Sequence, residues 1–395
     1  MTGTNLTATS SPIINRRRFL QSSLQLSSGL LLLPALSGCD FFKQSIQKSI
    51  LLSARNDVNG KHWCVGYALD GTEIFRTAVP QRCHDVLQHP SLPLTLFVAR
   101  RPGTHCYLID TSTGVLLQTL EARPDRHFYG HGLFDHDGTL YLTENDTSEP
   151  GRGVLGVYQW HKSRLRFSSE ISTHGIEPHQ FVWLPDNAGF AIANGGIRTE
   201  ADSRIALNET IESSLVLMNK NGTLISKETL SSGNSIRHIA MATDGTIVTA
   251  QQFTEQKFTE KAFSVSENKS TNNTATLLAI KKPGKPLEAF SVGAETEKQL
   301  QAYSASVAIH SDNRWLAVTA PRGNRLLLWH LDTGEQLLDV AVQDCAGITS
   351  TADGFIVSSG EGGCRSVQQQ VGLIRVQPLP LPAGGWDNHL ILAAT

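Results

Sequence analysis

Short runs of alternating apolar and polar residues follow one another along almost the whole chain, and turn sequences separate them. Asp-Gly and Asn-Gly pairs mark many of these turns, as at Asp137-Gly138 and Asn221-Gly222. No segment shows a convincing spacing of apolar residues at intervals of three and four, which an amphipathic helix requires. The pattern therefore predicts an all-β protein.

One unit recurs within this pattern and consists of an apolar strand, a turn and a second strand. Its copies are about 40 to 60 residues apart, which is the period of four-stranded propeller blades. The seven copies begin at Tyr67, Tyr107, Val157, Leu215, Leu277, Leu326 and Gly372. This repeat predicts a seven-bladed β-propeller.

A second recurring segment matches the two strands of a blade that lie nearest the propeller axis. Clear copies begin at His131, Phe181, Ile239, Val307 and Ile348. Residues 388–393 look like such an innermost strand without its partner, and residues 50–55 look like the partner alone. We therefore expect the C-terminal strand to pair into the first blade and close the ring, which also removes free sheet edges.

The N-terminal segment carries two motifs of exported lipoproteins. Arg16 and Arg17, followed by Arg18-Phe19-Leu20, resemble the twin-arginine export signal. Leu36-Ser37-Gly38-Cys39 resembles the lipobox, where a signal peptidase cuts before a lipidated cysteine. The apolar stretch between the motifs is too short to cross a bilayer of about 30 Å as a helix. Cys39 is therefore predicted to carry the lipid.

These motifs divide the chain into a signal peptide (residues 1–38), a lipidated tether (39–49) and a propeller domain (50–395). Asp40 follows the cysteine and resembles a signal for retention in the inner membrane. A lipid anchor needs no transmembrane helix, because each buried CH₂ group contributes about 0.8 kcal/mol. We expect the protein to be exported by the twin-arginine route and anchored at the periplasmic side of the inner membrane.

The composition excludes some functions. Lys and Arg number 34 against 36 Asp and Glu, and no basic run lies outside the signal, so nucleic acid is not an expected partner. Five cysteines remain after Cys39, and an odd number leaves at least one unpaired in an oxidising compartment. No pair is spaced as Cys-x-x-Cys, so a covalent haem and a thioredoxin-like site are unsupported.

Histidines stand at the beginning of the innermost strand in five of the seven predicted blades. They are His84, His131, His179, His238 and His389. These strand starts should converge at one mouth of the central channel. Neutral imidazole binds transition metals such as iron or copper, and Glu144 nearby would add a hard oxygen ligand that suits iron. The alternative is that each histidine donates a structural hydrogen bond to a neighbouring blade.

Arginines give a second hypothesis for the same mouth, which is recognition of carboxylates or a ferric chelate through bidentate guanidinium contacts. The candidates are Arg55, Arg100, Arg198, Arg237 and Arg322. Salt bridges to Glu144, Glu177 and Glu361 would explain the same arginines. Asn194, Gln251 and Glu361 are expected at this rim as well.

Familiar catalytic motifs are absent from the sequence, which has no Gly-x-Ser-x-Gly elbow, no phosphate-binding glycine loop and no His-Glu-x-x-His. Asp85 beside His84, or Glu144 near His131, could form an acid/base pair, but neither assigns a catalytic residue. A non-catalytic docking scaffold and an uncharacterised periplasmic enzyme both stay open.

Several longer motifs resemble the bacterial domain-of-unknown-function family 1513 (DUF1513). They are Gly175-Ile176-Glu177-Pro178-His179, Pro321-Arg322-Gly323, Trp386-Asp387-Asn388-His389 and residues 143–146, 151–158, 193–199, 214–216 and 235–238. Ala320 departs from the family pattern, which often has a serine there. The resemblance implies an exported propeller-like protein whose genes often neighbour those of imelysin-like periplasmic proteins linked to iron uptake. The expected function is therefore accessory to the uptake or handling of a metal, iron first, with a ligand or partner bound at the mouth of the central channel and such a protein as the expected partner.

Overall fold

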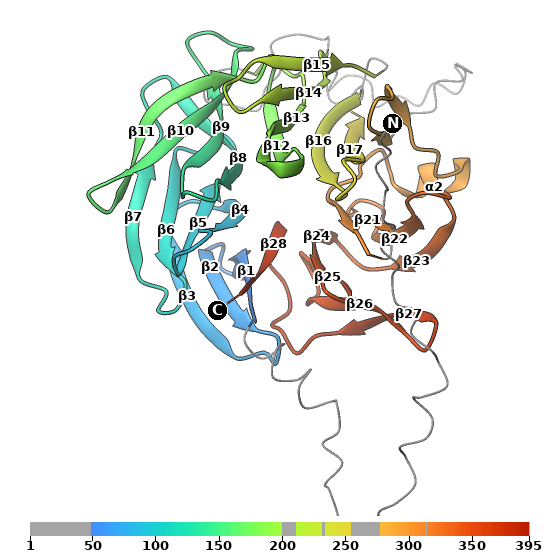
Figure 1. Cartoon of the computed structure of the whole chain (residues 1–395). Coiled ribbons are helices and arrows are strands. Elements are labelled where there is room, and N and C mark those ends of the chain that lie inside the picture. The colour runs from blue at the N-terminus through green and yellow to red at the C-terminus, as the bar shows by residue number, and fades with distance from the viewer. Residues whose placement is uncertain (1–48, 200–210, 231–233, 254–276, 313, 395) are drawn as a thin grey trace, which may run out of the picture. The chain divides into compact units, whose positions relative to one another are not determined.

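The computed structural model describes residues 49–199, 211–230, 234–253, 277–312 and 314–394. These residues form seven antiparallel sheets of four strands each, arranged in a ring (Figure 1). The innermost strand of each sheet contacts the innermost strands of both neighbouring sheets, so the series closes on itself. The predicted all-β, seven-bladed propeller is confirmed.

The blades follow the chain order except where the two ends of the chain meet. Blade one combines the C-terminal strand β28 (Trp386–Ala394) with β1 (Ser49–Asn56), β2 (His62–Ala68) and β3 (Glu73–Val79). Blade two holds β4 (Cys83–Gln88), β5 (Leu94–Ala99), β6 (His105–Asp110) and β7 (Leu116–Glu121). Blade three holds β8 (Arg126–Phe134), β9 (Leu140–Asp146), β10 (Gly153–His161) and β11 (Arg164–Ser172).

The remaining blades have the same order from the axis outwards. Blade four holds β12 (Pro178–Trp183), β13 (Gly189–Asn194), β14 (Ser214–Asn219) and β15 (Leu224–Glu228). Blade five holds β16 (Asn234–Met241), β17 (Ile247–Phe253), β18 (Leu278–Lys281) and β19 (Leu287–Ala289). Blade six holds β20 (Val307–His310), β21 (Trp315–Ala320), β22 (Arg325–His330) and β23 (Gln336–Ala341). Blade seven holds β24 (Cys345–Thr351), β25 (Gly354–Ser359), β26 (Arg365–Gln370) and β27 (Leu373–Pro378). Two short helices, η1 (Pro185–Asn187) and α2 (Ala294–Gln299), lie in connections.

The C-terminal strand closes the ring as predicted. β28 pairs antiparallel with β1 from Ser49 opposite Ala394 to Arg55 opposite Trp386. Leu390 of β28 is buried in the core that joins blades seven and one. The guanidinium of Arg55 also stacks on the Trp386 ring at 4.9 Å.

Separate apolar cores join neighbouring blades. Successive side chains of a strand point to opposite faces, so each sheet supplies residues to two cores. Phe97 packs edge-on against Phe75 at 6.5 Å in the core between blades one and two. The preceding residue, Leu96, packs with Phe128 between blades two and three. Each fully buried side chain of this size contributes about 1.5–3 kcal/mol.

The prediction that the third strand of blade seven begins at Gly372 was wrong. Gly372 lies in a turn with φ 77°, after Val371 with φ 51°, and the strand that follows is the outermost one. The third strand is β26, in which Gln368, Gln369 and Gln370 replace the apolar residues of the other copies. This polar composition hid the strand from a search for apolar runs.

The expected export features lie outside the described residues, and these include Arg16, Arg17 and Cys39. β1 begins at Ser49, one residue before the expected start of the propeller domain. Within the described part of the chain, no helix is long and apolar enough to cross a membrane.

The cysteines of the propeller form no disulfide. Cys64, Cys83, Cys106, Cys345 and Cys364 are all buried and free. The sulfur atoms of Cys64 and Cys83 lie 3.9 Å apart between blades one and two. Burial raises the pKa of the Cys345 and Cys364 thiols, the latter to about 12, which keeps them protonated and unreactive.

Closure by β28 predicts a stability effect. Leu390→Ala should lower the free energy of unfolding by about 2–5 kcal/mol, because a buried side chain of the closing strand is lost. The same change at Leu373, which is 62% exposed on outer strand β27, should cost less than about 0.5 kcal/mol. Urea unfolding of the metal-free protein measures both values. Equal effects of the two variants would contradict a stabilising role for the closing strand.

Candidate metal centre in the central channel

The five predicted histidines lie on innermost strands at places where pairing with the second strand is interrupted. Cys83 pairs with Ala99 and Asp85 pairs with Val98, so His84 is an extra residue between them. Such a β-bulge re-aims side chains and is common beside functional sites. Comparable interruptions accompany His389, His131, His179 and His238.

Buried hydroxyl groups of the second strands hold the irregular backbone in place. Ser53 donates a hydrogen bond to the carbonyl oxygen of His389 at 2.6 Å. Thr143 donates to the carbonyl oxygen of His131 at 3.1 Å. A carbonyl group that a bulge removes from the strand ladder needs such a partner when it is buried. The small polar residues of these strands therefore allow the bulges to form.

The bulges bring the five histidines together as one group, which we call the histidine cluster. The ring centroid of His131 lies 4.6 Å from that of His179, 4.7 Å from His389 and 4.9 Å from His84. Ligand nitrogens of His84, His131, His238 and His389 all lie within 4.8 Å of one another. All five residues are buried, with His179 the most exposed at 8%. The predicted convergence is thus observed, but the histidines are enclosed and do not form an open rim.

Two carboxylates orient members of the cluster. Asp387 accepts a hydrogen bond from Nδ1 of His84 at 2.9 Å, and Asp85 accepts one from Nδ1 of His131 at 3.0 Å. A carboxylate can only accept, so Nδ1 of each ring carries the proton and Nε2 has a free lone pair. Metal-ligating histidines are commonly held by carboxylates in this way.

Both carboxylates are ionised in this environment. Burial on its own would raise the pKa of Asp85, but the hydrogen bond from His131 and the nearby His389 ring lower it overall. Burial is also outweighed at Asp387, whose pKa is lowered by the hydrogen bond from His84 and by the charges of Arg82 and Arg100. Each group therefore acts as an acceptor at neutral pH.

His84, His179, His238 and His389 are neutral at pH 7. Burial lowers the pKa of His84 to about 4, even though Asp387 opposes this effect. Burial, followed by the charges of neighbouring rings, also brings the pKa values of His179 and His238 well below the usual value. The same burial lowers the pKa of His389. Neutral imidazole is the form that binds metals.

The spacing of the ligand atoms suits a single ion after a small adjustment. Nε2 of His238 and Nε2 of His389 lie 3.1 Å apart. Nitrogens about 2.1 Å from one ion lie about 3.0–3.4 Å apart when adjacent and about 4.2 Å apart when opposite. The separations in the group of four reach at most 4.8 Å, and a tetrahedral ion would draw the most distant pair in to about 3.4 Å with shifts of about 0.7 Å per ring. Channel width is therefore no obstacle to sharing an ion.

Glu144 does not join the histidine cluster, so its predicted role as a metal ligand or as an acid/base partner of His131 is wrong. Its carboxylate accepts hydrogen bonds from Tyr158 at 2.5 Å and from Arg123 at 3.0 Å. Burial raises the pKa of Glu144 although both contacts oppose the rise. The reason is geometric. Glu144 lies on β9 opposite Phe128 of β8, and its side chain enters blade three instead of the channel.

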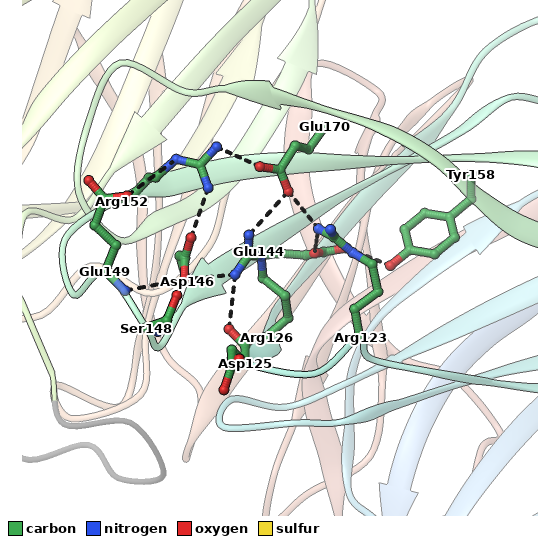
Figure 2. A network of polar contacts seen from close by, with 10 residues as sticks. All are labelled: Arg123, Asp125, Arg126, Glu144, Asp146, Ser148, Glu149, Arg152, Tyr158 and Glu170. Atoms are coloured by element: carbon green, nitrogen blue, oxygen red, sulfur yellow. Dashed lines mark hydrogen bonds and ion pairs between the residues drawn. The ribbon is translucent and has the colours of Figure 1, made fainter.

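Glu144 belongs to an ion-pair network that joins the strand ends of blade three (Figure 2). Arg123 and Arg126 both contact Glu170, at 2.7 and 3.3 Å. Arg152 contacts Glu170 at 2.5 Å and Asp146 at 2.8 Å. Positive and negative groups alternate, so the network fixes loop geometry and leaves little net charge for a ligand.

Three of the five predicted anion-binding arginines make structural contacts. Arg55 donates to a backbone carbonyl at 2.8 and 3.2 Å. Arg237 is buried and pairs with Glu177 at 2.5 Å, and burial lowers its pKa to about 10. Arg198 pairs with Glu212. The salt-bridge alternative accounts for Arg237, while Arg198 pairs with a different acid and Arg55 is held by backbone carbonyls.

Arg100 and Arg322 are different. Arg100 has one ion pair, to Asp387 at 3.7 Å, and Arg322 stacks on the Tyr303 ring at 4.8 Å. Neither guanidinium donates a hydrogen bond to any other residue in the described part of the chain. These two arginines therefore have donors available.

The other predicted rim residues have varied surroundings. Asn194 and Gln251 are buried, and each has a side-chain carbonyl oxygen with no hydrogen-bond partner among residues of known placement. Glu361 is exposed and accepts a hydrogen bond from Gln343.

Sequence reasoning missed the partners of the histidines. Asp85 was paired with its neighbour His84, but adjacent residues of a strand point to opposite sides, and Asp85 reaches His131 of the next blade. Asp387 was not identified as a site residue although it lies two residues before His389. Only the spatial adjacency of β28 and β4 makes its role visible.

The ion-pair network predicts a dependence of stability on pH. Burial would raise the pKa of Glu170, but its three arginines lower it to about 2. The stabilisation is therefore complete above the unfolded pKa of about 4.3 and is lost as the pH falls towards 2. Between about pH 5 and pH 3, Glu170→Gln should lose about 1 kcal/mol less unfolding free energy than the wild type. Urea unfolding at both pH values measures this.

Glu149→Gln is the matched control, since Glu149 is 74% exposed and its ion pair with Arg152 is long, at 3.9 Å. It should behave as the wild type does. The same pH slope in wild type and Glu170→Gln would show that the network adds no acid-sensitive stability.

The comparison with known proteins identifies the family. No match was found among curated proteins. The family described as "Protein of unknown function (DUF1513)" matches residues 77–393, which hold all five histidines and both orienting carboxylates. The chain is therefore a member of the DUF1513 family.

Proposed function

We propose that this propeller is a metal-binding protein of metal uptake or handling, which holds one transition-metal ion in its central channel. The observation that carries the proposal is the group formed by His84, His131, His238 and His389, whose ligand nitrogens lie within 4.8 Å of one another. Orientation of His84 and His131 by carboxylates supports it further.

The donor set favours copper(II) or zinc over iron. One of the two grounds for iron was a hard oxygen ligand, and Glu144 is engaged elsewhere. Imidazole suits copper, zinc, nickel and iron, and copper(II) binds most tightly among the divalent ions of the first row. Copper is therefore the first metal to test. If iron binds, the proposal becomes an accessory role beside a periplasmic iron-uptake protein such as an imelysin-like protein.

The site suits binding and handling better than catalysis. Catalytic zinc sites have three protein ligands and leave a position for water or substrate, whereas four protein ligands fill a tetrahedral ion. The burial of all four rings also limits access by a substrate. A role in holding or passing on an ion follows from these features.

The proposal locates the protein at the periplasmic side of the inner membrane, anchored by lipid after twin-arginine export. Support comes from the pair Arg16 and Arg17 and from the lipobox that ends at Cys39. A metal-handling protein at this surface would meet ions before they cross the inner membrane.

Lipidation has a direct test. Cells that express the full chain should incorporate labelled palmitate into the wild type and not into Cys39→Ala, because the thioether forms on that sulfur. Cys64→Ala, which changes a buried cysteine of blade one, should keep the label. Labelled Cys39→Ala, or unlabelled wild type, would refute the lipid anchor.

Metal binding is tested on the mature domain after removal of metal. The wild type should retain one copper(II) ion per chain through gel filtration. Its electron paramagnetic resonance spectrum should show splitting from several nitrogen ligands. His131→Gln and His238→Gln should each retain much less than one ion, because each removes a ligand. Elemental analysis gives the stoichiometry.

Two further variants separate a metal site from a structural cluster. His161→Gln changes an exposed histidine and should bind as the wild type does. Asp85→Asn keeps every ligand but weakens the orientation of His131, so affinity should fall by about 10–100-fold. If copper, zinc and iron all fail to bind or to raise the melting temperature, the metal proposal is wrong and a docking scaffold is the better account.

A further inference from the structure

A cavity of about 390 Å³ lies next to the histidine cluster. Arg82, Arg100, Tyr303, Asp344, Trp386 and Asn388 are among the residues that line it. Trp386 and Asn388 belong to the closing strand, and Asn388 lies between Asp387 and His389. The cavity therefore borders the candidate metal centre directly.

Asp387 connects the two places. Its Oδ1 accepts the hydrogen bond from Nδ1 of His84 at 2.9 Å, while its Oδ2 contacts Nε of Arg82 at 2.5 Å. Arg100 lies 3.7 Å from the same Oδ2. One carboxylate thus separates a cluster member from two arginines of the cavity wall.

Two of the arginines line the cavity from blade two, and the third lies beside it on blade six. Arg82 and Arg100 flank β4 and β5 of blade two, and their side chains are 37% and 28% exposed. Arg322 follows β21 of blade six and covers the ring of Tyr303, which lines the cavity. Blades seven and one lie between these two sides of the ring, so the positive groups are set apart from one another (Figure 1).

The charge balance at the cavity is positive. Against three guanidinium groups stand Asp387, which already accepts from His84 and Arg82, and Asp344. Burial raises the pKa of Asp344, and the negative charge of Glu361 adds to the rise. Tyr303 is close to the positive charges of Arg100, Arg237 and Arg322.

We propose that this cavity binds a small polycarboxylate anion through Arg82, Arg100 and Arg322. Guanidinium groups bind carboxylates through paired N–H donors, and Arg100 and Arg322 have donors available. Two separated positive sites fit a ligand with carboxylates at both ends better than they fit a compact single anion. The volume lies within the range of small-ligand pockets.

This inference goes beyond metal binding and does not depend on it, since the arginines and the cavity are present without an ion. If both proposals hold, the two sites are neighbours. Small polycarboxylates chelate transition metals, so the cavity would then place a chelating ligand beside the histidines.

The test is calorimetric titration of the metal-free mature domain with citrate at constant ionic strength. The wild type should bind one citrate per chain. Arg100→Gln and Arg322→Gln should each weaken binding about tenfold or more, because hydrogen bonds to charged groups are lost. Arg375→Gln changes an exposed arginine of outer strand β27 and should leave affinity unchanged.

A second ligand and two further variants complete the titration. Inorganic phosphate should bind more weakly than citrate, and equal affinity would overturn the assignment to polycarboxylates. Absence of citrate binding, or unchanged affinity in the Arg100→Gln/Arg322→Gln double variant, would overturn the site itself. His131→Gln should still bind citrate, so failure of the metal site and failure of the anion site give different results.

Discussion

The pairing of β28 with β1 is the contact on which both the ring and the candidate site depend. It joins segments at opposite ends of the chain, and the hydrogen bond from Ser53 to His389 spans 336 residues of sequence. The same strand supplies His389 to the cluster and Asp387 to His84 of blade two. Closing so long a loop costs conformational entropy, and the buried core between blades seven and one offsets it. The site therefore exists only in the closed ring.

Within the closed ring, the bulges convert a repetitive architecture into a specific centre. A regular innermost strand would place residues on its two faces in strict alternation. The interruptions of pairing in blades one to five break this alternation and turn imidazoles towards one another, and blade seven has a comparable interruption between Cys345 and Ile348 without a histidine. Blades six and seven supply Ser306 and Ala346 at the start of their innermost strands, and Ala346 lines the neighbouring cavity. The histidines of the cluster are thus confined to blades one to five.

The sequence predicts the repeat, the closure and the five histidines well, because all three depend on strand order. It fails where the answer depends on which face of a strand a side chain occupies or on contacts between blades. Glu144 was placed near His131 by strand order, but its face of β9 leads to Tyr158 and Arg123. Asp387 was overlooked for the same reason, since its partner His84 is 303 residues away.

The energetics of the cluster bear on the choice between a metal site and a purely structural role of the histidines. Hydrogen bonds to Asp387 and Asp85 satisfy Nδ1 of His84 and Nδ1 of His131. Nε2 of His131 and Nδ1 of His179 and of His238 are buried without a hydrogen-bond partner among the residues whose placement is known. Such atoms cost about 1–3 kcal/mol each, a large share of a domain stability of about 5–15 kcal/mol. Apolar side chains would pack the channel without this cost. A structural role leaves the cost of Nε2 of His131 unexplained, whereas ligation of a metal through this atom would account for it.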